Sequence, residues 1–384
     1  MLIIFVISIF IFNNLEGEIL IMNKYEKFAA SLNSAGCSSF NWTTDDNKHI
    51  WGRNFDFNRL AAGSNAQFVP RNTKYYTHGS IAEKTLDKDT ECHSKYAIAG
   101  MGGSSDGTIT ILYDGINEKG LMGGMLYFTP DAQYCSDVRP HTIPLQPTYT
   151  VTHVLSQCQN IDDVEKLFNE QVTLMQEKYF GQLFYLHWIF ADKNGEAAVV
   201  ESDANGLHIY RHTMGVLTNA PDYQWQKRNL LNYANIHNEN STNFHINDHN
   251  FIPLNGDGAQ GLPGDWSAVS RFVRLSFMKN FGIKGKNETE GISNMFRLLG
   301  NVAYPMGMVK KAPGHLGNIL PLDQGVTPYE YTVYSAAACA ESLRYYWISY
   351  QNSKVHYIDL AKLKDCFTPA TFDMKRIQEF DCVN

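Results

Sequence analysis

Cys37 is the cysteine whose neighbours in the sequence best suit nucleophilic chemistry. It follows the flexible pair Ala35-Gly36 and begins a run of β-forming residues, and Arg53 and Asp56 come in the next such run. A thiolate is the reactive form of cysteine, and a basic neighbour favours it. Side chains three apart on a strand face opposite ways unless a bulge intervenes, so Arg53 and Asp56 need not share a face. These residues alone leave two interpretations open for Cys37, a buried structural thiol and a nucleophile.

Other patterns that could bind phosphate or a metal are incomplete. In the stretch AGMGGSSDG, Gly100 and Gly102 are followed by Ser105 at the third glycine position of the dinucleotide fingerprint, and no GK[ST] follows. A tight turn beside a strand is predicted there instead. His245 and His249 lie in an Asn-rich stretch without a third ligand, and the seven cysteines form no CxxC pair. The sequence therefore predicts no metal site and no cofactor.

The composition is that of a folded protein that acts on small molecules. The chain has 384 residues, of which 44% are hydrophobic, and this length and content exclude a disordered tail or a small disulfide scaffold. Its formal net charge of −7 argues against nucleic acid as the main partner, because phosphate backbones select basic surfaces. A small-molecule substrate is the expectation.

Hydrophobic patterns divide the chain into alternating groups of strands and helices. Residues 37–57 contain two β-rich runs around the turn-forming cluster TTDDNK, which predicts a hairpin. Helical spacing recurs in 148–158, 161–172, 267–281 and 292–303. Short runs between 183 and 221, and again between 329 and 360, are typical of antiparallel strands. Without a repeat or a low-complexity linker, the pattern predicts one layered α+β domain.

Two segments do not fit this pattern. Residues 235–265 are rich in Asn, His, Gly and Pro, and we weigh a surface excursion against an assembly arm or lid. Residues 1–12 form an apolar run that is too short to span a bilayer and lacks the Lys or Arg that opens a secretory signal. Met22 begins an ordinary soluble start. A cytoplasmic protein is therefore predicted, with secretion as the alternative.

Five motifs in order resemble the choloylglycine hydrolase family. They are GCSSFNWTTDD…GRNFDF, LYDGINEKGLMGGMLYF, GVLTNAPDYQWQKRNL, GLPGDWSAVSRFVR and YTVYSAAACAES, and the similarity runs from residue 36 to about 350. Within the family, the chain is more similar to the penicillin V acylases than to the bile salt hydrolases. The resemblance implies an N-terminal nucleophile hydrolase fold, a four-layer αββα sandwich with two antiparallel sheets.

The resemblance also implies how the chain matures. Residues 1–36 would be a leader removed by self-cleavage between Gly36 and Cys37, leaving residues 37–384 as a single domain. The thiol of Cys37 would attack a carbonyl carbon, and its freed α-amino group would accept the thiol proton. A homotetramer is implied, with the segment after Tyr223 as assembly arm, and neither a cofactor nor a membrane partner is expected.

Further site residues carry over by position. Arg53 would favour the thiolate of Cys37, Asp56 would orient the α-amino group, and Arg271 would support the site. The side-chain amide of Asn219 and the backbone N–H of Tyr127 would stabilise the oxyanion. The structural alternatives are an ion pair between Arg53 and Asp56, a turn role for Asn219, and a solvated helix charge at Arg271.

The bulky side chain at Tyr127 decides the expected substrate. Penicillin V acylases tend to have Tyr there where bile salt hydrolases have Asn, and an aromatic ring would favour a flat phenoxyacetyl group over a steroid. The expected reaction converts penicillin V to 6-aminopenicillanic acid and phenoxyacetate. The alternatives are a bile salt hydrolase, an acylase of N-acyl homoserine lactones, and a binding protein that never undergoes cleavage.

Overall fold

The fold is built on two antiparallel sheets in a computed structural model that describes residues 36–58, 63–103, 107–179, 183–311, 327–378, 380 and 382–383. Residues 1–35, which are all but the last residue of the predicted leader 1–36, lie outside the described residues. The first sheet contains the predicted hairpin at its centre. Its order is β14 (Val216–Leu217), β1 (Gly36–Thr43), β2 (His49–Phe57), β18 (Tyr329–Cys339), β19 (Arg344–Ser349) and β20 (Asn352–Asp359), and β17 (Val309–Lys310) pairs with β18.

The second sheet has eight strands, taken mostly from the first half of the chain. Its order is β13 (Gly206–Tyr210), β12 (Ala197–Asp203), β11 (Leu186–Ala191), β8 (Met122–Tyr127), β7 (Ile111–Asn117), β6 (Ile98–Gly103), β3 (Ser64–Val69) and β21 (Ala370–Phe372). Sequential neighbours pair through short turns, as the run of turn formers predicts. Among the described residues, three short pairs lie outside the two large sheets: β4 (Lys74–Tyr76) with β5 (Glu91–His93), β9 (Ile143–Leu145) with β10 (Val172–Leu174), and β15 (Phe244–Ile246) with β16 (His249–Phe251).

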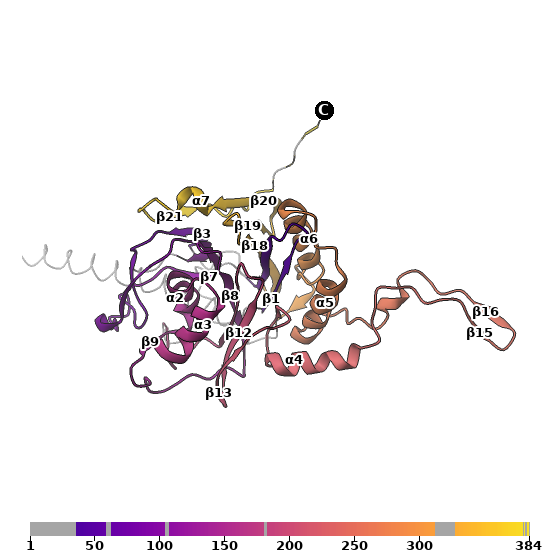
Figure 1. The fold of residues 1–384 in the computed structure, drawn as a ribbon, viewed down its shortest axis with the longest axis horizontal. Helices are drawn as coiled ribbons and strands as arrows, with labels where there is room; N and C mark the ends of the chain where they lie inside the picture. The colour runs from indigo at the N-terminus through magenta and orange to yellow at the C-terminus, as the bar shows by residue number, and fades with distance from the viewer. Residues whose placement is uncertain are drawn as a thin grey trace, which may run out of the picture.

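Helices cover the outer face of each sheet, which makes four layers (Figure 1). On the second sheet lies α2 (Thr150–Gln157), which α3 (Ile161–Lys166) follows in the chain, and on the first lie α5 (Ala268–Phe281) and α6 (Glu288–Gly300). Asn160, Ser267 and Asn287 cap three of these helices by accepting a hydrogen bond from a first-turn N–H. The αββα sandwich is confirmed. The helix predicted over 161–172 changes to a π-helical turn after Lys166.

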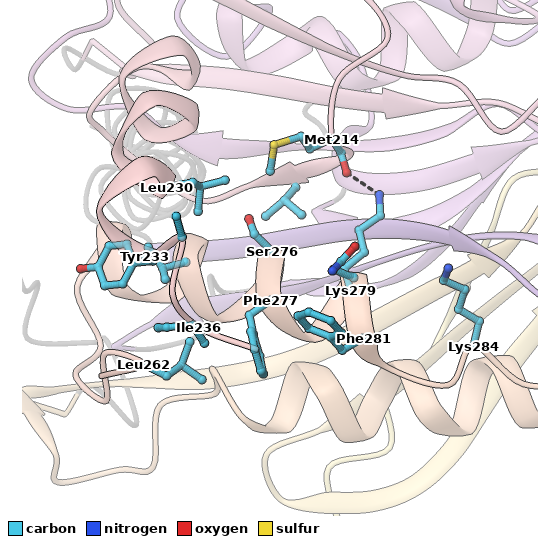
Figure 2. A pocket seen from close by; sticks show the side chains of 14 residues that line it. Met214, Leu230, Tyr233, Ile236, Leu262, Ser276, Phe277, Lys279, Phe281 and Lys284 are labelled. Carbon is cyan, nitrogen blue, oxygen red and sulfur yellow. Dashed lines mark hydrogen bonds between the residues drawn. The ribbon is translucent and has the colours of Figure 1, made fainter. Parts of the chain in front are cut away.

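The stretch 235–265 forms an arm that projects from the sandwich (Figure 1). It follows α4 (Tyr223–Asn229) and contains the hairpin of β15 (Phe244–Ile246) and β16 (His249–Phe251). Tyr233 and Ile236, near the base of the arm, lie alongside Phe277 of α5 (Figure 2). This polar stretch therefore forms a protruding arm.

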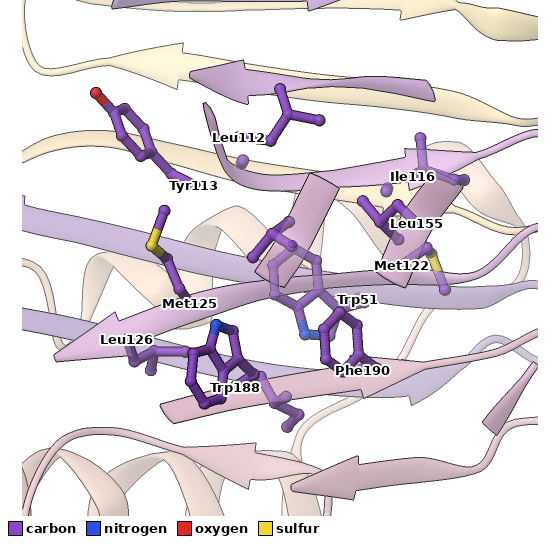
Figure 3. Packing of buried hydrophobic residues seen from close by; sticks show 14 of the residues in the cluster. Trp51, Leu112, Tyr113, Ile116, Met122, Met125, Leu126, Leu155, Trp188 and Phe190 are labelled. Carbon is purple, nitrogen blue, oxygen red and sulfur yellow. The ribbon is translucent and has the colours of Figure 1, made fainter. Parts of the chain in front are cut away.

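The core between the sheets is filled by large apolar side chains (Figure 3). Trp51 of β2 is fully buried, and a Cβ at Gly124 of β8 would lie 3.1 Å from its ring. Its neighbour Gly52 faces the other way, against Met295 of α6. Strand alternation therefore turns odd-numbered residues of β2 toward the second sheet and even-numbered residues toward the helices.

The glycine-rich stretch gives a partial correction. Gly100 and Gly102 lie within β6 rather than in a turn beside it, while residues 104–106 fall outside the described part. A Cβ at Gly102 would meet the carbonyl of Ile111, at the point where the register of β6 and β7 shifts. Close approach of two strand backbones explains these glycines.

Among the described residues, no group of three or more His, Cys, Asp or Glu is placed to hold a metal ion. Nor does that part of the chain contain a helix long and apolar enough to cross a membrane.

Candidate active site

Cys37 is the second residue of β1 and is contacted from both faces of the first sheet. It pairs with Phe55 of β2, so its thiol faces the second sheet together with Arg53, whose Nη2 donates to Cys37 Sγ. Asp56 faces the opposite way, toward α5, and pairs with Gly36. Alternation thus holds, and the two residues act on different parts of Cys37. Arg53 contacts the thiol, whereas Asp56 lies beside the Gly36–Cys37 linkage.

Arg53 is held by the second sheet at the point where β7 and β8 separate. The last paired residues there are Asp114 and Gly124. Arg53 Nη1 donates to the carbonyls of the next residues, Tyr113 at 3.1 Å and Met125 at 2.9 Å. It also forms an ion pair with Asp114 at 3.3 Å. The guanidinium therefore bridges two carbonyls that lack a ladder partner in this gap, which satisfies them and fixes the charge beside the thiol.

Asp114 is a buried carboxylate that the candidate set did not include. Besides Arg53, it accepts hydrogen bonds from the hydroxyls of Tyr334 and Tyr345, on β18 and β19. Burial raises the pKa of Asp114, while Arg53 and the two hydroxyls oppose that change. Its signal in the sequence was an acidic residue inside the apolar run TITILYDG, where an unpaired charge would be costly.

Asp56 carries one unsatisfied oxygen. Thr332 Oγ1 donates to Oδ1 at 2.6 Å, while Oδ2 is buried without a hydrogen-bond partner and lies 3.9 Å from Arg271 Nη1. Burial raises the pKa of this carboxyl to about 6, against the lowering effect of Arg271. Thr332 was not among the candidates either. The alternation of the strand that contains Thr332 predicts that its side chain is buried, but it does not predict the hydrogen bond to Asp56.

Asn219 lies between Cys37 and α5. Its Oδ1 accepts hydrogen bonds from the backbone N–H of Cys37 at 3.1 Å and from Arg271 Nη2 at 2.6 Å. Its Nδ2 donates to the carbonyl of Tyr127 at 2.8 Å. The preceding residue, Thr218, is anchored through its carbonyl, which lies 3.0 Å from His187 Nε2. Asn219 therefore joins Cys37, Arg271 and Tyr127 in one hydrogen-bond network, which goes beyond the turn role considered for it.

Arg271 is only 2% exposed, so the solvated-charge alternative is wrong. Besides Asn219, it donates to the carbonyl of Cys37, to Ser38 Oγ at 2.7 Å and to the carbonyl of Trp266 at 2.9 Å. The structural alternative of an ion pair between Arg53 and Asp56 is also wrong, because each residue has another partner. Arg53 pairs with Asp114, and Asp56 with Arg271.

The backbone of Tyr127 faces Asn219. Phe128 N donates to the carbonyl of Tyr185, so Phe128 and Tyr185 form a hydrogen-bonded pair where β8 and β11 lie side by side. Tyr127, one residue earlier, therefore turns both its N–H and its carbonyl away from β11. The carbonyl meets Asn219 Nδ2, so the N–H lies on the same side. This arrangement places the two expected oxyanion donors together.

The thiol itself is protonated in the full-length chain. Burial raises the pKa of Cys37 to about 11, although Arg53 lowers it. Arg53 thus acts in the expected direction, but burial outweighs it. A reactive thiolate needs a nearby base, and in this chain the nitrogen of Cys37 is still an amide.

The six candidate residues, Cys37, Arg53, Asp56, Tyr127, Asn219 and Arg271, come together from β1, β2, β8, α5 and the segment after β14. The model of the linear amide C–N hydrolases, choloylglycine hydrolase family, matches residues 37–372. The chain belongs to this family. Its match begins at Cys37 and covers both sheets and the arm.

Several curated relatives of the chain are named for bile salts or bile acids. The chain is 29% identical over 330 residues to the bile salt hydrolase/transferase of Clostridium perfringens, covering 85% of this chain and 93% of the relative. It is 30% identical over 327 residues to the protein of that name from Lactiplantibacillus plantarum, covering 84% and 92%.

Solved structures support the fold. A mutant conjugated bile acid hydrolase from Clostridium perfringens matches with a TM-score of 0.78 and 25% identity over 91% of this chain and 100% of that one. The penicillin V acylase from Agrobacterium tumefaciens matches with a TM-score of 0.62 and 21% identity, over 85% and 87%. The greater similarity to penicillin V acylases that the motifs suggested is therefore not supported.

Proposed function

We propose that residues 37–384 act as a cysteine N-terminal nucleophile hydrolase whose preferred substrates are bile acid amides. The observation that carries the mechanism is the contact of Arg53 with the thiol of Cys37, while Asp56 Oδ2 stays unsatisfied beside the Gly36–Cys37 linkage. Cleavage of that linkage would create an α-amino group next to the unpaired carboxylate oxygen, which could accept a hydrogen bond from it. The start of the family match at Cys37 supports the same boundary.

The reaction follows from the proposed roles. The α-amino group of Cys37 takes the thiol proton, and Sγ attacks the carbonyl carbon of the substrate amide. The oxyanion that forms is stabilised by the N–H of Tyr127 and by the second N–H of Asn219 Nδ2, whose first N–H is bound to Tyr127. The C–N bond then breaks, and the amine leaves with the proton. Water, activated by the same amino group, hydrolyses the thioester and releases the acid.

The choice of bile acid amides rests on the relatives, which have this activity in their names and match over nearly their whole length. Penicillin V is the second candidate, favoured by the half-buried ring of Tyr127 beside the proposed oxyanion site. Both are linear amides with an apolar acyl group.

A substrate panel tests the proposal. We would measure amine release from glycocholate, taurocholate, penicillin V and an N-acyl homoserine lactone, with Cys37→Ala as the blank. The highest kcat/KM on the bile acid amides is expected. A higher value on penicillin V would favour the second candidate, and no release from a correctly folded, uncleaved chain would indicate a binding protein.

We also propose that the arm serves assembly into a homotetramer. The hairpin and the residues just after it expose apolar side chains that a monomer would leave in water: Phe244, Ile246, Phe251, Ile252 and Leu254. Light scattering tests this assembly, and a monomeric mass would contradict it.

A further inference from the structure

A cavity of about 480 Å³ lies between α5 and the base of the arm. Leu230 and Ile236 line one side, and the rings of Phe277 and Phe281 line the other (Figure 2). This volume falls within the roughly 300–1,000 Å³ of typical small-molecule sites. The cavity is separate from the candidate active site, since none of the six site residues lines it.

Lys279 places a half-buried positive charge in this apolar cavity. It lies eight residues after Arg271 on α5, about 12 Å along the helix axis. Its Nζ donates to Asn41 Oδ1 at 2.9 Å and to the carbonyl of Met214. Gly215 makes room for it, because a Cβ there would lie 2.5 Å from Nζ.

The charge of Lys279 has no acidic counterpart in the described part of the chain. An ammonium has three N–H donors, and the protein occupies two of them. Burial, together with the smaller effect of the charge of Lys284, which also lines the cavity, lowers the pKa of Lys279 to about 8. Two cations without a carboxylate make a local positive field that an anion would balance.

Ser276 gives a second, independent sign of a missing ligand. Its Oγ is buried and has no hydrogen-bond partner within the described ranges. It lies one turn before Lys279, and Figure 2 shows its hydroxyl and the Lys279 amine on the same side of α5. A buried hydroxyl left without a partner costs free energy that a bound oxygen acceptor would recover.

We propose that this cavity binds an amphipathic monocarboxylate. Its carboxylate would accept hydrogen bonds from Lys279 and Ser276, and its apolar body would lie between Phe277 and the aliphatic side chains at the arm base. The site needs neither cleavage at Cys37 nor amide hydrolysis, so it stands or falls independently of the proposed reaction.

Titration calorimetry with decanoate tests the site, with decan-1-ol as the uncharged control. Lys279→Met is expected to raise the Kd for decanoate at least tenfold and to leave the weaker binding of decan-1-ol unchanged. Lys286→Met is the matched control, because this lysine is exposed and does not line the cavity. Equal Kd values for decanoate and decan-1-ol, or no effect of Lys279→Met, would overturn the proposal.

A second variant and a direct location guard against indirect effects. Ile236→Glu places a negative charge at the half-buried wall of the cavity without changing the core, and it should also weaken decanoate binding. Crystals soaked in 10-bromodecanoate should show the bromine between α5 and the arm base. Bromine found only beside Cys37 would assign the binding to the active site and refute the cavity site. Thermal unfolding and amide hydrolysis of each variant report separately on folding and on the proposed reaction.

Discussion

The guanidinium of Arg271 donates a hydrogen bond from Nη2 to Oδ1 of Asn219 at 2.6 Å. Because arginine is only a donor, this contact turns Oδ1 toward α5 and leaves Nδ2 toward the carbonyl of Tyr127. The reverse orientation would set donor against donor. A helix of the outer layer therefore decides which atom of Asn219 faces the proposed oxyanion.

Replacing Arg271 by lysine should impair catalysis because one ammonium cannot reproduce the planar set of donors. We expect kcat to fall about 100-fold, the loss typical of one oxyanion donor, with KM changed less. Arg274→Lys is the matched control, since Arg274 is also buried on α5 but donates to the carbonyls of Pro263 and Asp265. Equal losses in the two variants would argue against a positioning role.

Cleavage before Cys37 should be visible in the intact mass of the purified protein. The wild-type chain is expected to have the mass of residues 37–384, whereas Cys37→Ala should retain residues before position 37. Cys158→Ala, which removes another buried thiol, should still be cleaved. Cleavage of the Cys37→Ala chain would show that the thiol is not the nucleophile.

Asp56 should lower the stability of the uncleaved chain as the pH rises. Its pKa is about 6 in the folded chain and 3.8 by reference, so the folded state holds the proton between these values and loses stability as pH increases through them. Two pKa units correspond to about 3 kcal/mol. In a Cys37→Ala background, Asp56→Asn should raise the free energy of unfolding at pH 8 but not at pH 4. If Asp56→Asn changed the free energy of unfolding equally at pH 4 and pH 8, the pH dependence would not come from Asp56.

Tyr127 should influence substrate preference. Tyr127→Asn is expected to change the ratio of kcat/KM for penicillin V and glycocholate by about 10-fold in favour of glycocholate, since one pocket contact is worth about 1–3 kcal/mol. The backbone N–H is unchanged by the substitution, so the variant should stay active. An unchanged ratio would show that the ring of Tyr127 does not determine substrate preference.

Trp51 should be important for joining the sheets. Trp51→Ala removes a fully buried ring that packs against Gly124 of the facing sheet, and a loss of about 3–5 kcal/mol in the free energy of unfolding is expected. Denaturant titration measures it. Trp225→Ala, at a residue that is 44% exposed, should change the free energy by much less.

The sequence predicted the fold class well because strands and helices carry their periodicity locally. The hairpin at residues 37–57, the helices at 267–281 and 292–303 and the antiparallel runs all appear in the structure. It predicted the glycine-rich stretch less well. The need for Gly102 arises from the backbone of β7, which lies against β6 only after folding.

The candidate residues were found through their motifs, while their partners were not. Cys37, Arg53 and Asp56 are close in the sequence, and alternation already set the last two on opposite faces. Thr332 and Asp114 were missed because each acts through a residue that is distant in the sequence.

What the sequence by itself determined is the set of reactive groups and the elements that carry them, because residue type and periodicity are local properties. Only the tertiary structure decided that Arg53 meets the thiol on one face, while on the other Arg271 donates to the carbonyl of Cys37 and Asp56 lies beside the Gly36–Cys37 linkage. It also decided that Lys279 is half-buried and has no carboxylate as an ion-pair partner among the described residues. Burial and charge pairing depend on which distant segments pack together, and no local pattern records that packing.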